Sequence, residues 1–300
     1  MADNSKITPL DERPRSGPYG GLNINSAKRF LTKQFEQAEL ATPDIDARLL
    51  VMAATGFNRS ELIANGTDFL SQDAFTKISE FADRRLSGEP VDHILAKREF
   101  YGRNFHISKD VLSPRPDTEC LIDQALPFLE NLEHPKILEL GSGTGAIILT
   151  LLAECEGATG IAADISKHAI NMTQKNASAL GLSKRLNIIE SDWFSHVEGN
   201  YDLIISNPPY IDEKAMTELS PEVKNYDPHL ALFGGIDGLN PYRVIARDGH
   251  NHLNTQGALI LEIGFDQAIV VRDILKQNNW QNITLFQDLA GQDRCLLARP

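Results

Sequence analysis

The sequence predicts an α/β protein, in which a small bundle of helices precedes a seven-stranded, mostly parallel sheet. Two observations lead to this fold class. After Pro135, short apolar runs alternate with longer stretches of helical periodicity, and this alternation implies a parallel sheet that is covered by helices on both faces. Before residue 89, apolar residues recur at the three- and four-residue spacing of helices.

The chain has 300 residues, enough for one large domain and a smaller one. Residues 1–24 mix Pro and Gly with charged residues and are expected to be a disordered leader. Residues 25–88 are expected to form the helical bundle, and residues 89–116 a connector with a β-hairpin around residues 100–107. Residues 117–300 are expected to form the sheet domain.

Four helices are expected in the bundle, beginning near Ser26, Pro43, Asn58 and Ser71, and the last one ends before Gly88. In the sheet domain, seven apolar runs are expected to be strands: Ile137 to Leu140, Gly160 to Ile165, Leu186 to Ile189, Leu203 to Ser206, Ala258 to Ile263, Ile283 to Gln287 and Cys295 to Ala298. Helices are expected at Ala146 to Cys155, Lys167 to Leu180 and Gln267 to Asn278.

Composition narrows the class of function. The formal charge is −12, and the sequence has no dense Lys/Arg run, which argues for a protein or small-molecule substrate rather than duplex DNA. No run approaches the length of a membrane-spanning helix, and the N-terminus lacks a signal sequence, so a cytoplasmic location is expected. The three cysteines lie far apart, without paired spacing, and we expect neither a disulfide nor a metal site.

A glycine-rich turn follows the first predicted strand, with the sequence Gly141-Ser142-Gly143-Thr144-Gly145, and a helix begins directly after it. Glycines allow the tight turn and let a ligand approach the backbone, and the N-terminus of the helix offers free N–H groups. Ligands of parallel sheets bind beyond the carboxyl ends of the strands. The turn is therefore expected to bind a cofactor.

Two further strand ends complete a nucleoside site. Asp164 ends the second predicted strand, where a carboxylate can accept hydrogen bonds from ribose hydroxyls. Asp192 and Trp193 follow the third strand and offer an acceptor for an adenine amino group and an aromatic face for stacking. These residues alone leave open whether the cofactor is NAD or S-adenosylmethionine. The G-x-G-x-G spacing, with Glu139 two places before it, resembles the first motif of Rossmann-like methyltransferases.

The fourth strand ends in Asn207-Pro208-Pro209-Tyr210. Consecutive prolines cannot continue a central strand, so the backbone leaves the sheet at the ligand-binding edge. The Asn207 side-chain oxygen and the Pro208 carbonyl, the two groups expected to be catalytic, could each accept one N–H of a planar NH₂ group. Pro209 and Tyr210 are expected to complete the substrate site, with Tyr210 stacking on the planar group. This pattern fits either adenine or glutamine.

Here the sequence resembles the bacterial PrmC/HemK-type methyltransferases, which modify the glutamine of the Gly-Gly-Gln loop in peptide chain release factors. The resemblance covers roughly residues 25–300. Besides the Asn-Pro-Pro-Tyr tetrapeptide, it depends on Arg98-Glu99-Phe100-Tyr101-Gly102, Ser113-Pro114-Arg115-Pro116-Asp117-Thr118-Glu119, Ser191-Asp192-Trp193-Phe194 and Ala290-Gly291-Gln292-Asp293-Arg294. The chain departs from the family at Lys97, where Gly is frequent, and in its proline-rich leader.

The resemblance implies a Rossmann-like class I methyltransferase domain and S-adenosyl-L-methionine as the cofactor. It places Gly141 to Gly145, Asp164, Trp193 and Asn207 at the cofactor and Pro208 to Tyr210 at the glutamine. Peptide chain release factors are then the expected protein partner, and residues 25–88 would help to hold them. We expect a monomer without stable nucleic-acid binding and without membrane association.

Three alternatives remain at this point. The first is an adenine-N6 methyltransferase, because an exocyclic amine presents two N–H groups to the same acceptors. The second is a glutamine methyltransferase that acts on a ribosomal protein, although the related enzymes lack the Arg115-to-Glu119 run. The third is a binding module that retains the cofactor pocket without turnover.

Overall fold

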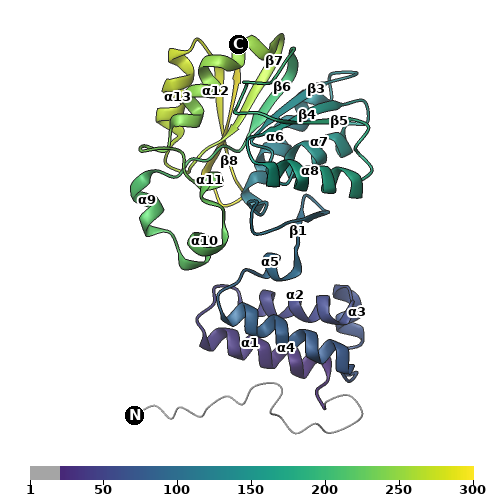
Figure 1. The fold of residues 1–300 in the computed structure, drawn as a ribbon. Coiled ribbons are helices and arrows are strands. Elements are labelled where there is room, and N and C mark those ends of the chain that lie inside the picture. Colours follow the sequence, from purple (N-terminus) through teal and green to yellow (C-terminus); the bar gives the residue numbers. More distant parts are fainter. Residues whose placement is uncertain (1–20) are drawn as a thin grey trace. The chain divides into compact units, whose positions relative to one another are not determined.

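The computed structural model describes residues 21–300 and divides into two compact units, one ending at Leu95 and the other spanning Ala96–Pro300 (Figure 1). The predicted leader therefore lies almost entirely outside the described residues. The segment predicted as a connector, residues 89–116, contributes to both units. Within residues 21–300, no helix combines the length and the apolar character that crossing a membrane would require.

The first unit is helical, as the spacing of its apolar residues predicts. Its described part contains α1 (Ile24–Gln37), α2 (Pro43–Thr55), α3 (Arg59–Ala64), α4 (Gln72–Leu86) and α5 (Val91–Leu95). The Asn23 and Ser71 side chains accept the backbone N–H groups of Ser26 and Ala74, and so cap α1 and α4. The four predicted helices are confirmed, and α5 lies in the segment that was expected to be a connector.

A β-hairpin opens the second unit. Strands β1 (Lys97–Phe100) and β2 (Arg103–His106) pair in antiparallel register. Both residues of the connecting turn, Tyr101 and Gly102, have positive φ, 48° and 71°, which is the geometry of the two-residue turns that match the twist of paired strands. The predicted hairpin is confirmed.

The second unit contains the seven-stranded sheet, and all seven predicted strands are confirmed. The strands are β3 (Lys136–Leu140), β4 (Thr159–Asp164), β5 (Leu186–Glu190), β6 (Tyr201–Ser206), β7 (Leu253–Glu262), β8 (Gln281–Gln287) and β9 (Asp293–Arg299). Their order is β5-β4-β3-β6-β7-β9-β8. The strands from β5 to β7 are parallel, and β9 runs antiparallel to both β7 and β8.

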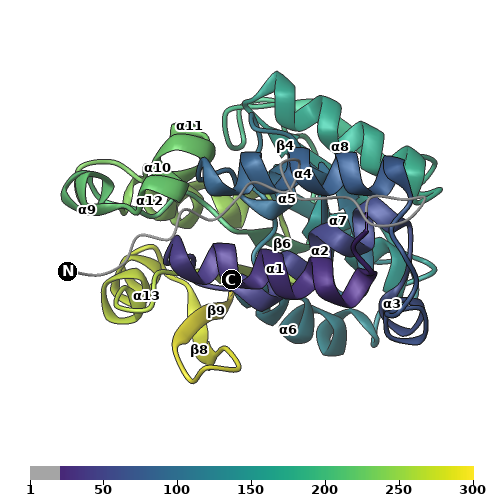
Figure 2. The same ribbon diagram turned by 90° about the horizontal axis from the view of Figure 1, so that it is seen from below.

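Helices cover both faces of this sheet (Figures 1 and 2). One face packs against α6 (Glu119–Leu129), α7 (Ala146–Glu154) and α8 (Lys167–Ala179), and the other against α12 (Asn240–Asp248) and α13 (Ala268–Gln277). Successive strand residues alternate between the two cores, as Ile137 and Leu138 do. The predicted α7, α8 and α13 are confirmed, whereas α6 and α12 were not predicted.

The chain between β6 and β7 also forms α9 (Glu213–Glu218), α10 (Pro221–Tyr226) and α11 (His229–Leu232), which were not predicted either. Two short 3₁₀ turns, η2 (Pro116–Thr118) and η3 (Gly249–His252), precede α6 and β7. Neither α9 nor α10 has a buried residue, so neither shows the apolar stripe that reveals a helix in a sequence.

The strand order fixes where a ligand can bind. The chain moves outward from β3 to β4 and β5, and then returns to place β6 on the other side of β3. At such a reversal the loops after neighbouring strands diverge and leave a crevice beyond the carboxyl ends of the strands. The loops that follow β3, β4 and β6 contain the glycine turn, the residues after Asp164, and Asn207.

Candidate functional site

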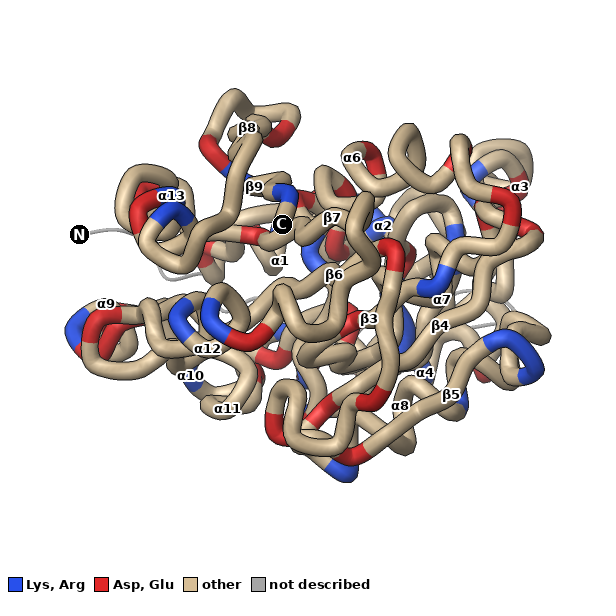
Figure 3. The backbone as a smooth tube through the Cα atoms, turned by 90° about the horizontal axis from the view of Figure 1, so that it is seen from above, with Lys and Arg blue, Asp and Glu red and all other residues tan. Residues whose placement is uncertain are grey.

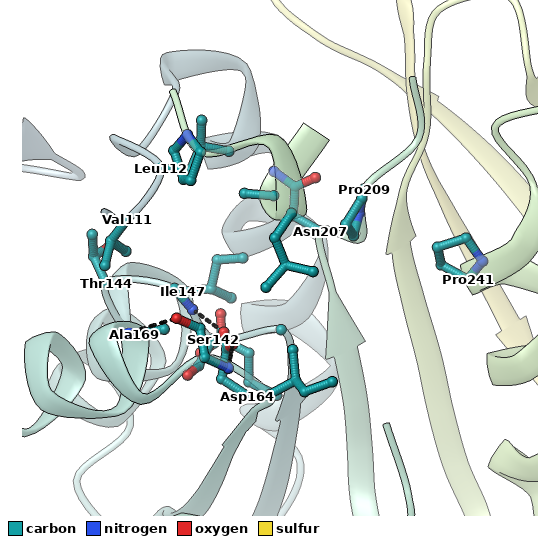
Figure 4. Close-up of a pocket in the computed structure, with 18 of the residues that line it drawn as sticks. Val111, Leu112, Ser142, Thr144, Ile147, Asp164, Ala169, Asn207, Pro209 and Pro241 are labelled. Atoms are coloured by element: carbon teal, nitrogen blue, oxygen red, sulfur yellow. Dashed lines mark hydrogen bonds between the residues drawn. The ribbon is translucent and has the colours of Figure 1, made fainter. Parts of the chain in front are cut away.

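A cavity of about 400 Å³ lies at this reversal, within the second unit. The predicted residues that line it are Gly141, Ser142, Gly143, Thr144, Asp164, Asp192, Trp193, Asn207 and Pro209. Figure 4 shows Val111 and Leu112 across the cavity from Asn207, with Ser142 and Asp164 below them in the view. The structure thus gathers residues from four separate loops around one site of the size that binds small molecules.

The glycine turn has the conformation that its sequence predicts. Gly141, Gly143 and Gly145 have φ values of 70°, 56° and 76°, a region that residues with a side chain rarely adopt. A Cβ atom on Gly145 would lie 2.8 Å from Thr173 Cγ2. Gly145 is absent from the described residues that line the cavity, so its contribution is to let α7 pack closely against α8.

Asp164 supports the glycine turn as well as lining the cavity. Its two carboxylate oxygens accept the backbone N–H groups of Gly143 and Ser166, each at 2.8 Å. Burial raises the pKa of Asp164 above its ordinary value, and the backbone hydrogen bonds act in the opposite direction. The carboxylate therefore ties the end of β4 to the turn after β3.

Glu139 is the second carboxylate beneath the glycine turn. It is 1% exposed, lines the cavity, and its Oε2 accepts the Ile148 N–H in the first turn of α7 at 3.2 Å. Burial raises its pKa well above the ordinary value of a glutamate. Asp110 and Asp192 bring the number of carboxyl groups in the described cavity wall to four, together with Glu139 and Asp164.

Trp193 lies in the loop after β5 with a φ of 51°. Its carbonyl accepts the Ser191 hydroxyl at 2.8 Å, and the Asp192 N–H donates to Ser195 Oγ at 3.1 Å. These hydrogen bonds fix the loop that presents Asp192 and Trp193 to the cavity. Trp193 also packs against the apolar core on the α12 side of the sheet.

Asn207 stands at the end of β6 and lines the cavity. Its Nδ2 donates a hydrogen bond to Thr118 Oγ1 at 3.1 Å. Pro209 also lines the cavity, whereas Pro208 and Tyr210 are absent from the described residues of its wall. The Tyr210 carbonyl accepts Gln267 Nε2 at 2.9 Å, and its ring packs against the core of the unit.

The stacking of Tyr210 on a substrate amide stays a prediction, and the structure shows its ring partly buried against the core. Burial raises the pKa of its phenol to about 12. The group therefore stays neutral at physiological pH and does not act as a base.

Three side chains near Asn207 were not predicted as site residues. Thr118, from η2, is 4% exposed, and Glu262, at the end of β7, is 2% exposed. Arg294, from β9, pairs with Asp288 and Asp117. For Glu262 a signal existed, because a single carboxylate within an apolar strand must have a partner or a raised pKa.

A salt bridge joins two of the segments that line the cavity. Arg115, from the segment before η2, pairs with Asp227, which follows α10. The Asp227 carboxylate is 5% exposed and the Arg115 side chain is 46% exposed. Both adjoining segments, residues 110–115 and 228–235, contribute to the wall.

Comparisons with known proteins place these features in a family. Residues 26–95 match the family described as PrmC N-terminal domain, and residues 119–222 match the methyltransferase small domain. Among solved structures, the catalytic domain of human Mettl16 in complex with an RNA hairpin superposes with a TM-score of 0.55 at 15% identity, covering 71% of this chain and 81% of that one. At this identity the likeness shows the fold alone.

Closer relatives align over most of the chain. A release factor glutamine methyltransferase of Agrobacterium fabrum is 44% identical, over 93% of this chain and 98% of the relative. One of Bradyrhizobium diazoefficiens is 40% identical over 87% and 89%, and one of Neisseria gonorrhoeae is 37% identical over 86% and 93%. The chain therefore belongs to the release factor glutamine methyltransferase family.

Proposed function

We propose that this protein transfers a methyl group from S-adenosylmethionine to the side-chain amide nitrogen of the glutamine in the Gly-Gly-Gln loop of peptide chain release factors. The observation that carries the proposal is the position of Asn207. It directly follows β6 beside the cavity, and its nitrogen donates to Thr118 Oγ1, so its oxygen remains as an acceptor for a planar N–H₂ group. The Agrobacterium fabrum relative that is 44% identical to the chain has the name of a release factor glutamine methyltransferase.

The charges of the cavity wall fit S-adenosylmethionine. Besides the buried Glu139, whose pKa burial raises well above its ordinary value, the described wall has three carboxyl groups, from Asp110, Asp164 and Asp192, and one basic side chain, which is already paired with Asp227. A dinucleotide such as NAD would bring two phosphates to this acidic surface, whereas a sulfonium and an amino group are attracted by it. When bound, S-adenosylmethionine would supply an electrophilic methyl group.

The glycine turn and the strand-end residues would hold the cofactor. Gly141, Ser142, Gly143 and Thr144 bring the backbone to the cavity, and Asp164 and Asp192 offer acceptors for hydroxyl and amino groups. Trp193 adds an aromatic face beside them.

An amide nitrogen is a weak nucleophile, because its lone pair is delocalised into the carbonyl group. Acceptors at Asn207 Oδ1 and the Pro208 carbonyl would orient the two N–H bonds and stabilise the positive charge that develops on nitrogen. The proton can leave to water after transfer, so the side chains need not include a general base. The neutral phenol of Tyr210 agrees with this scheme.

Adenine in nucleic acid is the main rival substrate, since it presents a similar N–H₂ group. Figure 3 shows acidic positions interspersed with basic ones along the elements, and the chain carries a net charge of −12. Phosphate binding requires clustered Lys and Arg. The charge therefore favours a protein substrate, and we infer no stable binding to nucleic acid.

The first unit is proposed to help hold the release factor, because its sequence matches the N-terminal domain of the same family over residues 26–95. We further propose that the protein works as a monomer in the cytoplasm, where its proposed substrates act in translation.

The proposal is tested by comparing substrates. The protein is incubated with methyl-labelled S-adenosylmethionine and one of three substrates: a release factor, a ribosomal protein or an adenine-containing oligonucleotide. We expect label on the release factor at a rate at least about tenfold above the other two. A release factor with Glu in place of the loop glutamine is the matched control and should stay unlabelled. Faster labelling of the oligonucleotide or ribosomal protein would overturn the proposal.

A further inference from the structure

A buried carboxylate lies behind Asn207, outside the cavity. Parallel pairing of β6 and β7 places Ser206 opposite Leu261, so Glu262 is the next residue along β7 beside Asn207. Glu262 is 2% exposed and is absent from the described cavity wall. Its backbone carbonyl accepts the Tyr242 hydroxyl at 3.0 Å, which holds the end of the strand in place.

Glu262 shares its surroundings with the hydrogen bond that fixes Asn207. Contacts with the side chains of Thr118 and Asn207 favour the charged form of its carboxylate, and Asn207 Nδ2 itself donates to Thr118 Oγ1 at 3.1 Å. The Oε2 atom of Glu262 has no hydrogen-bond partner among the described residues. A buried carboxylate with an unsatisfied oxygen is costly, and such groups are found where function requires them.

The other groups around Glu262 do not neutralise it fully. Those coupled to it by charge are Arg294, Asp117, Tyr210, Tyr242, Cys120 and Cys295. Arg294 is the cation among them, and its guanidinium also pairs with Asp288 and Asp117. Burial is the largest effect and raises the pKa of Glu262 to about 7.

The protonation state of this carboxyl decides which way the neighbouring dipoles point. An ionised carboxylate can only accept hydrogen bonds. The Thr118 hydroxyl then donates to Glu262, and its oxygen accepts Asn207 Nδ2, which turns Asn207 Oδ1 away from the pair. A protonated Glu262 can donate instead, so Thr118 or Asn207 can reverse. A reversed Asn207 would meet the substrate N–H₂ with its own NH₂ group.

We propose that Glu262 is a positioning residue, which in its ionised form acts through Thr118 to hold Asn207 Oδ1 toward the substrate amide. This inference rests on the proposed function for its effect on turnover. The geometry that it describes exists without substrate and can be measured separately.

The kinetic test uses near-isosteric variants. Glu262→Gln should lower kcat for release factor methylation by about 10- to 100-fold, the scale for losing one hydrogen bond to a charged group. Its Kd for S-adenosylmethionine should not change, because Glu262 does not line the described cavity wall. Thr118→Val should act in the same direction, and Thr118→Ser should recover most of what Thr118→Val loses, because it retains the hydroxyl.

The pH dependence of kcat distinguishes a positioning role of Glu262 from a merely structural one. The kcat of the wild-type protein should rise with pH through a midpoint near the pKa of Glu262, about 7, because deprotonation makes the carboxylate an acceptor. Glu262→Gln should lose this rise. Wild-type kcat and an unchanged pH profile in Glu262→Gln would overturn the inference while leaving the proposed function intact.

A measurement without substrate completes the test. In protein with ¹⁵N-labelled asparagine, the Asn207 side-chain NH₂ signals are identified by their loss in Asn207→Asp. They should shift with pH near 7 in the wild-type protein and stay fixed in Glu262→Gln. Signals that do not titrate would contradict the role of Glu262, whereas titrating signals in a protein that fails to methylate release factors would contradict the proposed function alone.

Discussion

The two sides of the cavity are stabilised by different kinds of contact. On one side, here called the cofactor half, Gly141 to Gly145 and Asp164 are joined mainly by backbone hydrogen bonds, and the carboxylate accepts N–H groups of Gly143 and Ser166. On the other side, the amide half, Asn207 depends on the side chains of Thr118 and Glu262. We propose that the cofactor is held largely by main-chain groups that Asp164 supports, whereas the orientation of the substrate amide depends on a series of side chains, from Glu262 through Thr118 to Asn207.

The largest effect is expected from Asn207→Ala, which removes the acceptor of the amide half. Losing one preorganised partner in the transition state should lower methyl transfer by more than about 100-fold. Single-turnover rates with saturating release factor would measure this loss. Near-normal turnover would mean that another group accepts the amide N–H.

Asp164→Asn tests the cofactor half, and here we expect a loss of cofactor affinity rather than of the methyl-transfer rate. The asparagine has a single acceptor oxygen where the carboxylate accepts two backbone N–H groups, so one partly buried donor is left unpaired. The affinity for S-adenosylmethionine should fall by about tenfold or more, with kcat at saturating cofactor nearly unchanged. Calorimetric titration gives the affinity, and a loss confined to kcat would show that the two halves are not separable.

Gly145→Ala examines the packing beneath the glycine turn. The added Cβ would meet Thr173 at 2.8 Å and Leu149 at 3.1 Å, with a φ of 76°. We expect a loss of about 1–3 kcal/mol in the free energy of unfolding beyond the backbone strain.

Gly181→Ala is the matched control, because Gly181 has a similar φ of 71° and an added Cβ there would meet nothing within 4 Å beyond its chain neighbours. It should cost only the strain, about 1 kcal/mol. Chemical denaturation measures both variants, and equal losses would contradict the packing role of Gly145.

The smallest expected effect is a gain in stability. Burial raises the pKa of Glu262 from 4.5 to about 7, so the folded protein binds this proton more tightly than the unfolded chain. The resulting stability is fully present below pH 4.5 and is lost as the pH rises through about 7. Glu262→Gln avoids that loss and should melt a few degrees above the wild-type protein at about pH 8, with little difference near pH 5.

This gain would accompany a loss of activity, which is the pattern of a residue kept for function at a cost in stability. Thermal unfolding at the two pH values provides the measurement. A variant less stable than the wild-type protein at both would show that the carboxylate mainly supports the fold.

The cofactor half and the amide half also differ in how many of their residues could be predicted from the sequence. The glycine turn, Asp164 and Asn207 follow predicted strands, and periodicity located all seven strands, so their meeting at one edge could be predicted. Thr118 and Glu262 could not be paired with Asn207, because their approach depends on how η2 and β7 pack around β6. The short helices α9 and α10 bury no side chain and left no periodic signal.

Tyr210 illustrates the limit of motif reasoning. The tetrapeptide predicts that its ring stacks on the substrate, and this stays a prediction. The structure shows that Gln267 Nε2 donates to the Tyr210 carbonyl and that the partly buried ring packs against the core. A motif places Tyr210 after the end of β6, whereas the direction of its side chain depends on tertiary packing that a motif does not contain.

The most direct test of the central claim is to locate the transferred methyl group. Fragment-ion mass spectrometry of a release factor treated with the wild-type protein and S-adenosylmethionine should place it on the side-chain nitrogen of the Gly-Gly-Gln glutamine, and treatment with Asn207→Ala should leave that glutamine almost unmodified. A methyl group on another residue, or an unmodified release factor after treatment with a protein that binds the cofactor, would contradict the account.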